Sequence, residues 1–227
     1  MKYIVFGLGN FGAALSVKLQ QLGNEVVGAD KSMEKVEAMK DLITHAICLD
    51  STDADAVGIL PLHDADAVVV AIGEDVGASI MTTALMKQMK VKRLIGRAIS
   101  PLQETVLEAM GVEEIIHPEE EAADRLSKKL NMRGVVDSFF LDNNYNIVEA
   151  IVPKRYEGST IGTINLRLKY NITVLTLLKS REQKNAIGIS RKITSTVGVA
   201  TADTKLEQGD IMVLFGHIKD ITRLLQE

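Results

Sequence analysis

The sequence contains very little cysteine, tryptophan or proline. Cys48 is the only cysteine among 227 residues, tryptophan is absent, and there are four prolines. One cysteine cannot form a disulfide within the chain, which excludes a disulfide-stabilised secreted scaffold and favours a reducing compartment. Because Cys48 stands in the apolar stretch HAICL, we expect its thiol to be a small core side chain rather than a nucleophile or ligand.

Long hydrophobic runs and an excess of charge of one sign are also missing. The longest uninterrupted apolar run, AVVVAI at residues 67–72, is far shorter than the ~20 residues of a membrane-spanning helix. The net charge of −4 gives no general electrostatic reason to bind nucleic acid. The first strand is expected to begin at Tyr3, which leaves no room before it for a targeting peptide. We therefore expect a folded cytoplasmic protein.

The first half of the sequence alternates between short runs rich in Val and Ile and segments with a helical pattern. Strands are expected at KYIVFG, EVVGAD, THAICLD, AVVVAIG, RLIGRA and EEIIHP, and helices at about residues 11–22, 32–40, 53–60, 75–89, 101–110 and 119–131. Six such strands, each followed by a crossover, are typical of a doubly wound, Rossmann-like α/β fold with a parallel sheet. The expected strand order is 3-2-1-4-5-6, with a binding crevice between strands 1 and 4.

This alternation stops near Gly134. The segment VVDSFFLDNNYNIVEAIVP predicts two strands joined by a polar turn, and the remainder predicts a short helix, further strands and a closing helix over IKDITRLLQE. We expect two domains: a nucleotide-binding domain over residues 1–134, which includes the helix at 119–131, and a smaller mixed α/β domain over residues 135–227.

A glycine motif lies between the first strand and the first helix. Gly7, Gly9 and Gly12 have the G-x-G-x-x-G spacing, with Asn10 and Phe11 between the last two. The first glycine permits a tight turn, the second lets a diphosphate approach the backbone, and the third lets the helix lie close to the sheet. The amides at the helix N-terminus favour an anion, so we expect a diphosphate there.

Further candidate residues lie where the later strands end. Asp30, at the end of the second strand, can accept hydrogen bonds from both ribose hydroxyls and disfavours a 2′-phosphate, although Lys31 beside it weakens that exclusion. The alternative is that Asp30 only caps the next helix. The remaining candidates are Asp50 and Ser51 at the adenosine half, Ile72 and Gly73 at the mouth of the crevice, and Arg97 toward a terminal phosphate or second base. For each of these, the alternative is a surface or capping residue.

Groups suited to catalysis are scarce. None of the four histidines is paired with a carboxylate at catalytic spacing, and no His/Cys cluster indicates a metal centre. In IIHPEEE, the three acids complement a helix dipole, or they bind a divalent cation if a second copy brings another set close, with Glu119 as the ligand. A small NAD-dependent oxidoreductase remains an alternative. A redox-sensing DNA-binding repressor ranks below it, because no helix-turn-helix precedes the first strand.

Several stretches together resemble the RCK (KTN) family, the cytosolic regulators of potassium channels and of Trk and Ktr potassium uptake systems. They are GLGNFG, GADKSMEKV, THAICLDSTD, the long segment from AVVVAIGEDVGAS to RLIGRA, EEIIHPEEEAADRL, STIGTINLRLKYNITVLTLLKS and LEQGDIMVLFGHIKDI. The resemblance covers essentially the whole chain.

The resemblance implies a regulatory subunit without catalysis that senses an adenine nucleotide: NAD(H), ADP, AMP or ATP. Such subunits form homodimers, assemble into rings of about eight, and press on a membrane-embedded potassium-conducting protein, at the inner face of the cell membrane. It also implies a divalent cation near Glu119 at a dimer interface. In the C-terminal half it implies a cyclic di-AMP site, whose candidate wall is Ile161, Ile164, Asn165, Leu166 and Arg167.

The chain departs from this family at one position of the glycine loop. ATP-regulated relatives often have arginine where this chain has Asn10. An arginine suits a γ-phosphate, whereas Asn10 offers only neutral hydrogen bonds. This difference strengthens AMP, ADP and NAD(H) as candidates.

Overall fold

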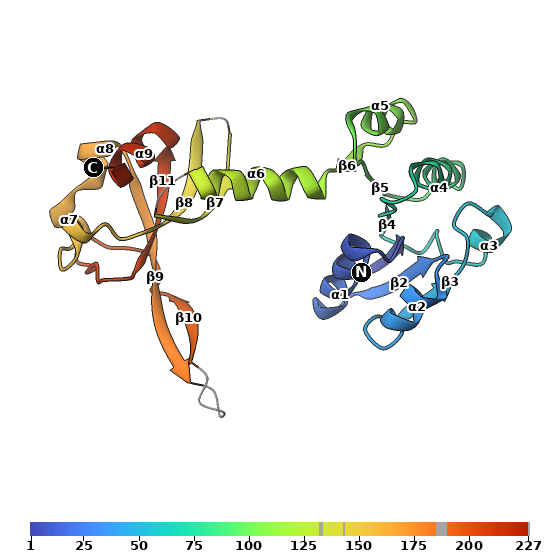
Figure 1. Cartoon of the computed structure of the whole chain (residues 1–227), viewed down its shortest axis with the longest axis horizontal. Helices are drawn as coiled ribbons and strands as arrows, with labels where there is room; N and C mark the ends of the chain where they lie inside the picture. The colour runs from blue at the N-terminus through green and yellow to red at the C-terminus, as the bar shows by residue number, and fades with distance from the viewer. Residues whose placement is uncertain (132–133, 143, 185–189, 227) are drawn as a thin grey trace. The chain divides into compact units, whose positions relative to one another are not determined.

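The computed structural model describes residues 1–131, 134–142, 144–184 and 190–226 (Figure 1). It forms two compact units, Met1–Glu121 and Ala122–Glu227, which divide inside helix α6 (Pro118–Asn131). Each unit has its own sheet and its own core. The domain limits expected from the sequence, 1–134 and 135–227, keep this whole helix with the first domain, and that assignment stays a prediction.

The first unit is built around a six-stranded parallel sheet. Its strand order is β3-β2-β1-β4-β5-β6, as the sequence predicts. The strands are β1 (Lys2–Phe6), β2 (Glu25–Asp30), β3 (His45–Cys48), β4 (Ala67–Val70), β5 (Leu94–Arg97) and β6 (Glu114–Ile116), and the helices between them are α1 (Asn10–Gln21), α2 (Met33–Met39), α3 (Ala54–Gly58), α4 (Val76–Gln88) and α5 (Pro101–Ala109).

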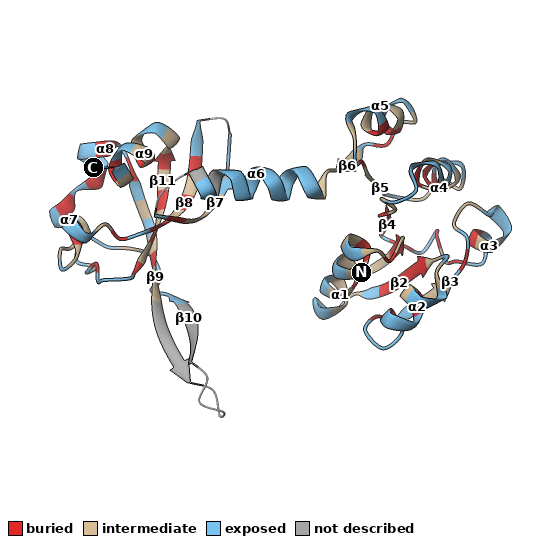
Figure 2. Cartoon of the chain, viewed as in Figure 1, coloured by how far each residue is buried: buried red, intermediate tan, exposed pale blue. Residues whose placement is uncertain are grey.

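Both faces of this sheet are covered by apolar side chains. Ile4 and Phe6 of β1 belong to the cluster that includes Met86 of α4 and Leu107 of α5. Val5, between them, faces the other cluster, which includes residues of α1 and α2. Because successive residues of a strand point to opposite faces, β1 is apolar throughout, as expected for a central parallel strand. Figure 2 shows buried residues in the strands of this sheet.

The second unit contains an antiparallel five-stranded sheet in the order β10-β9-β11-β8-β7. Its core includes side chains from the strands and from the helices α8 and α9. This is the mixed α/β domain that the sequence predicts, except that two short helices stand where one was expected. The elements are β7 (Val135–Phe140), β8 (Tyr145–Ile151), the 3-10 helix η1 (Lys154–Tyr156), α7 (Ile161–Ile164), α8 (Leu166–Tyr170), β9 (Thr173–Lys184), β10 (Ser190–Thr196), β11 (Ile211–His217) and α9 (Ile218–Gln226).

The expectation that Cys48 belongs to the core is wrong. Cys48 is the last residue of β3, and its side chain is exposed, with Sγ 3.6 Å from the carbonyl oxygen of Lys31. The reason is that β3 is a short strand at the edge of the sheet, so no neighbouring strand covers its outer side. An apolar stretch in an edge strand therefore does not bury all of its residues.

None of the helices in the described ranges combines the length and apolar character that a bilayer-spanning segment needs. In helix α6, the side chains from Glu119 to Ser127 are all exposed (Figure 2).

Candidate functional site

A pocket of about 810 Å³ opens where the parallel strands of the first unit end. In a doubly wound sheet, ligands bind outside the carboxyl ends of the strands, at the point where the strand order reverses. Here that point lies between β1 and β4. Of the residues that the sequence proposes for nucleotide binding, those that line the pocket are Gly7, Gly9, Asn10, Phe11, Asp30, Lys31, Asp50, Ser51, Ile72, Gly73 and Arg97.

The three glycines of the loop differ in their surroundings. Gly7 has φ +92°, a conformation that favours glycine, and it makes the turn out of β1. A Cβ at Gly12 would lie 1.8 Å from the carbonyl oxygen of Gly7, so only glycine lets α1 start this close to the sheet. Gly9 has nothing within 4 Å of its Cβ position and faces the open pocket. Gly12 therefore holds the loop in shape, and Gly9 leaves space for a ligand.

The N-terminus of α1 is available to an anion. Helices α2, α3, α4 and α5 each begin with a side chain that accepts a hydrogen bond from an amide of the first turn. The N-cap residue of helix α1 is Gly9, which has no side chain to accept such a bond. The first amides of this helix point where a phosphate would supply the missing acceptor, in line with the partial positive charge of a helix N-terminus. The residues present therefore fit a diphosphate.

Asp30 ties the loop after β1 to the loop after β2. Its Oδ2 accepts a hydrogen bond from the amide of Leu8 at 2.7 Å, and its Oδ1 accepts one from the amide of Ser32 at 2.8 Å. Ser32, and not Asp30, caps α2. Each carboxylate oxygen keeps capacity for a second hydrogen bond, so Asp30 can also accept from a ribose.

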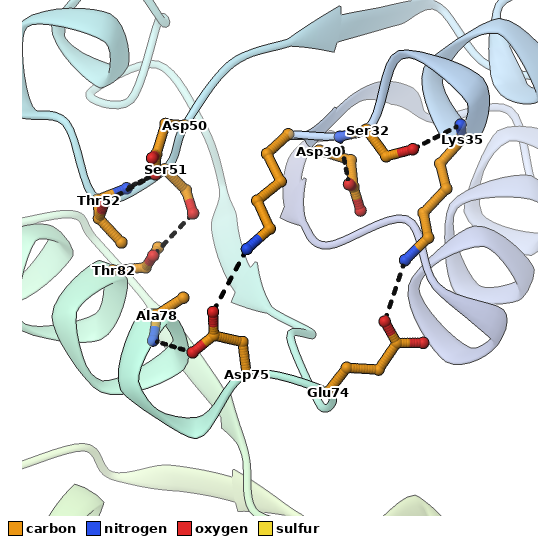
Figure 3. A network of polar contacts seen from close by, with 11 residues as sticks. Asp30, Ser32, Lys35, Asp50, Ser51, Thr52, Glu74, Asp75, Ala78 and Thr82 are labelled. Carbon is orange, nitrogen blue, oxygen red and sulfur yellow. Dashed lines mark hydrogen bonds and ion pairs between the residues drawn. The ribbon is translucent and has the colours of Figure 1, made fainter.

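Two ion pairs span the pocket lining between the β2–α2 segment and the β4–α4 segment. Lys31 Nζ lies 3.3 Å from Asp75 Oδ2. Lys35 Nζ lies 3.5 Å from Glu74 Oε2 (Figure 3). Asp75 also caps α4 by accepting from the amide of Ala78, which is the main reason that the pKa of Asp75 is lowered, with Lys31 adding to it.

Several of these pocket residues are not found by sequence reasoning. They are Ala29, Lys35, Ala71, Glu74, Asp75, Val76, Ala78 and Ile99. The two ion pairs join residues 44 and 39 positions apart, so no local pattern could reveal them. Residues 74–76 directly follow AVVVAIG, where the sequence predicts the fourth strand, and this position was a usable signal, because residues after a strand of this sheet border the crevice.

Arg97 is held at the far side of the pocket. Its guanidinium donates to the carbonyl oxygen of Ala71 at 3.1 Å, lies 5.5 Å from the ring centre of Phe11, and forms an ion pair with Glu119. A Cβ at Gly73 would lie 2.7 Å from the guanidinium, so the glycine makes room for it. Arg97 Nε is buried without a hydrogen-bond partner.

Asp50 and Ser51 line the pocket after β3. Asp50 accepts from the hydroxyl and the amide of Thr52, at 2.7 and 2.9 Å, and these two donors lower the pKa of Asp50. The Ser51 and Thr82 hydroxyl oxygens lie 2.8 Å apart, which ties this loop to α4 (Figure 3).

A metal centre is not formed within the part of the chain that the structure describes. No group of three or more His, Cys, Asp or Glu side chains is arranged to hold an ion there. Glu119 lines the pocket and pairs with Arg97, while His117 Nε2 lies 3.2 Å from Glu104. A cation bound by Glu119 with a second copy of the chain stays a prediction.

The proposed second ligand site lies in the second unit. Ile164 and Leu166 are buried there in the core, at 6% and 2% exposure, so their side chains are not available to a ligand. Ile161 is half-buried, and Asn165 and Arg167 are exposed. The accessible part of the predicted wall is therefore Ile161, Asn165 and Arg167.

Comparison with known proteins identifies the family. Residues 3–118 match the model of the TrkA-N domain. Over 222 residues, the chain is 31% identical to Ktr system potassium uptake protein C of Bacillus subtilis (strain 168). These residues are 98% of this chain and 95% of the relative. The chain belongs to the TrkA/KtrA family. Ktr system potassium uptake protein A of the same organism is 31% identical to the TrkA/KtrA chain over 226 residues. These residues are 100% of the TrkA/KtrA chain and 96% of the relative.

Solved structures agree with the fold of this TrkA/KtrA chain. The RCK domain of GsuK has a TM-score of 0.64 at 16% identity, with 99% of this chain and 47% of that chain covered. The GsuK channel bound to NAD has a TM-score of 0.63 at 15% identity, covering 100% and 39%. The TrkA/KtrA chain thus spans about half or less of those chains. The RCK fold and the family membership predicted from the sequence motifs are both confirmed.

Proposed function

We propose that this chain is the nucleotide-sensing regulatory subunit of a potassium uptake system. The observation that carries the proposal is the pocket at the end of β1, in which the uncapped N-terminus of α1 faces open space beside Gly9. Its relatives named Ktr system potassium uptake proteins A and C supply the biological context.

The ligand of this pocket is an adenine nucleotide. The amides of α1 bind its phosphates, and Asp30 accepts from its ribose hydroxyls. NAD(H), ADP, AMP and ATP all share these groups. Asn10, which is exposed in the first turn of α1, has no charge to offer a terminal phosphate.

The regulatory action requires a larger assembly. Two copies form a homodimer, dimers form a ring of about eight chains, and the ring acts on an integral-membrane potassium-conducting subunit from the cytoplasmic face of the membrane. Nucleotide exchange changes the conformation of the ring, and the ring gates the conducting subunit. The mass of the purified protein tests this assembly, since a ring of eight has about eight times the chain mass of 24.8 kDa.

Two further ligands belong to the proposal. A divalent cation binds Glu119 at an interface between copies, and cyclic di-AMP binds between two C-terminal domains against Ile161, Asn165 and Arg167. The exposure of Asn165 and Arg167 supports the second of these sites.

A regulatory role also fits the chemistry of the pocket lining. Among the residues that the structure describes, no histidine, cysteine or tyrosine lines the pocket. Of these three, histidine is the side chain that most often transfers a proton in catalysis. The alternative function, a small NAD-dependent oxidoreductase, predicts that the protein oxidises NADH with some substrate. Measured turnover of this kind would support that alternative over the regulatory role.

Calorimetric titration with ATP, ADP, AMP, NAD and NADH tests the sensing function, and a growth assay tests the regulatory one. Bacteria that lack their own potassium uptake receive a Ktr-type conducting subunit with or without this chain, and growth is measured at low potassium. We expect at least one nucleotide to bind and growth to require the chain. If no nucleotide binds and none raises thermal stability, the sensing function is wrong.

A further inference from the structure

The two halves of the pocket lining differ in chemistry. In a doubly wound sheet, the half after β1–β3 and the half after β4–β6 each receive one nucleotide of a dinucleotide. The lining after β2 and β3 includes the polar side chains of Asp30, Lys31 and Ser51. The lining after β4 and β5 includes Val76 and Ile99, which are 39% and 46% exposed. This second half therefore offers apolar surface to a planar ring.

The backbone that carries Ile99 is held by a side chain of α5, Gln103. Gln103 Oε1 accepts a hydrogen bond from the amide of Ile99 at 3.0 Å, and Nε2 donates one to the carbonyl oxygen of Arg97 at 3.2 Å. These two bonds lie on either side of Ala98, so they fix the segment that leaves β5. They also fix the orientation of the side-chain amide, because a backbone N–H can only donate and a carbonyl oxygen can only accept.

Gln103 is also bound to α4. Its Nε2 donates to Ser79 Oγ at 3.1 Å, and Gln103 is 2% exposed while Ser79 is fully buried. Ser79 lies in the first turn of α4, and its amide donates to the carbonyl oxygen of Asp75, which lines the pocket. One buried side chain thus connects the two loops that line the second half, although Gln103 itself is not a lining residue.

Loss of the Gln103 amide would release the β5–α5 segment. The Ser79 hydroxyl would lose its partner in a fully buried place, and the segment Arg97–Ile99 would lose two backbone hydrogen bonds. A segment that is no longer held has to be ordered when a ligand binds, and this ordering costs affinity. The cost falls on ligands that contact the segment.

We propose that Gln103 is a positioning residue for the second half of a dinucleotide, because it holds Ile99 where a second planar ring binds. The inference rests on the proposed function of the pocket as a nucleotide site and extends it to ligands that continue beyond the diphosphate. ADP and NADH share the adenosine and the diphosphate. The hydrogen bonds of Gln103 therefore act on the part in which these two ligands differ, which is the nicotinamide riboside.

The test is titration of the full chain with NADH and with ADP. Gln103→Met keeps an unbranched side chain of similar length but can make none of the three hydrogen bonds. We expect this variant to bind NADH about tenfold more weakly than wild type does, because the loop must be ordered on binding. The affinity for ADP should change by less than about twofold, since ADP ends at the diphosphate. If ADP binds too weakly for direct titration, its displacement of NADH gives its affinity.

Thr83→Val is the matched control. Thr83 is fully buried on α4, and its hydroxyl donates to the carbonyl oxygen of Ser79 within the same helix at 2.7 Å. Loss of this buried hydroxyl should lower Tm without changing the ratio of NADH affinity to ADP affinity. This ratio is the measurement that a purely structural role of Gln103 would leave unchanged.

Ser79→Ala supplies a second and milder variant. It removes the bond from Gln103 to α4 and keeps the two bonds to the β5–α5 segment, so the affinity ratio should fall by less than in Gln103→Met. The double variant should lose no more than Gln103→Met alone, because both changes break the same bond. Thermal unfolding checks that each variant is folded at the titration temperature, and Ser79→Ala carries the test if Gln103→Met is unfolded.

Three results would overturn the inference. One is an unchanged or increased ratio of NADH affinity to ADP affinity in folded Gln103→Met, or in Ser79→Ala when that variant carries the test. A second is an equal fall of the ratio in Thr83→Val, and the third is a wild-type protein that binds ADP but not NADH. Each leaves nucleotide binding intact, whereas failure of both nucleotides to bind the wild type removes the proposed function as well.

Discussion

Gly9 and Gly12 lie three positions apart in one loop, yet a methyl group added at each meets different surroundings. At Gly9 it points into open space, and the backbone has φ −69°, which alanine adopts readily. At Gly12 it would collide with the carbonyl oxygen of Gly7. One position therefore affects the ligand and the other affects the fold.

We predict that Gly9→Ala lowers nucleotide affinity by about tenfold or more without lowering Tm, because the methyl group occupies the space of the diphosphate. Gly12→Ala should lower the free energy of unfolding by about 1–3 kcal/mol or more, because the loop must shift to relieve the overlap. Calorimetry and thermal unfolding separate the two effects. Equal losses of Tm in both variants would contradict this division.

The pKa of Asp50 offers a second prediction at this scale. The hydroxyl of Thr52, followed by its amide, lowers this pKa from the ordinary value of 3.8. A lowered pKa means that the contribution to stability is present above pH 3.8 and is lost as the pH falls through the folded value. Thr52→Val removes the hydroxyl donor, so the pKa of Asp50 should rise toward its ordinary value.

A ¹³C NMR titration of the carboxyl groups measures this rise. Asp142 serves as the internal control, because its own lowered pKa comes from the amides of Tyr145 and Asn144, in the second unit. An Asp50 pKa that does not move in Thr52→Val would show that the hydroxyl is not its main partner.

The role of a single residue could be predicted from the sequence where it depended on a short local motif. The glycine spacing and the position of Asp30 follow from a short motif, and the structure places these residues around one pocket. The pairing of Arg97 with Glu119 joins residues 22 positions apart, and it depends on where β5 and α6 end. Cys48 was misassigned because apolar neighbours in sequence do not reveal that a strand lies at a sheet edge.

At the scale of elements, the order and type of most helices and strands follow from the sequence. Apolar runs that end in polar or glycine residues gave the parallel strands, since both faces of each are buried. The break between α7 and α8 was missed because it depends on Asn165, whose φ of 45° stops one helix and starts the next. Asparagine is common at the first position of a helix and also in this left-handed conformation, so the residue alone did not distinguish one helix from two.

Helix α5 provides the prediction at this scale. Its N-cap is Ser100, whose hydroxyl oxygen accepts from the amide of Gln103 at 3.3 Å, and Pro101 follows at the first helical position. Ser100→Ala should lower the free energy of unfolding by about 1 kcal/mol, while Ser100→Asp should retain most of it. Denaturant unfolding measures both. An alanine variant as stable as wild type would mean that the cap contributes nothing here.

At the scale of the whole molecule, the nucleotide pocket is built from residues of the first unit alone. Ligand at about 100 times its Kd stabilises the bound form by about 2.7 kcal/mol. Amides of residues 1–121 that exchange only on unfolding of that unit should therefore exchange about 100-fold more slowly when nucleotide is bound. Hydrogen exchange of the full chain measures this, and equal slowing in residues 122–227 would show that the two units unfold together.

The energy needed for gating is small when it is shared over an assembly. Moving a two-state gate from 1:99 to 99:1 takes about 5.5 kcal/mol of differential binding. Divided over the proposed ring of about eight chains, that is about 0.7 kcal/mol for each, comparable to one net hydrogen bond.

At Asn10 of the glycine loop, neither the backbone conformation nor a close contact restricts which side chain can stand there. Gly7 and Gly12 are fixed by a positive φ and by a backbone contact, while Asn10 is exposed between them. A mutation at position 10 can therefore alter the charge presented to a ligand at little cost in stability. Descendants of this chain could switch from one metabolic signal to another through a single codon, without first acquiring a stabilising change elsewhere.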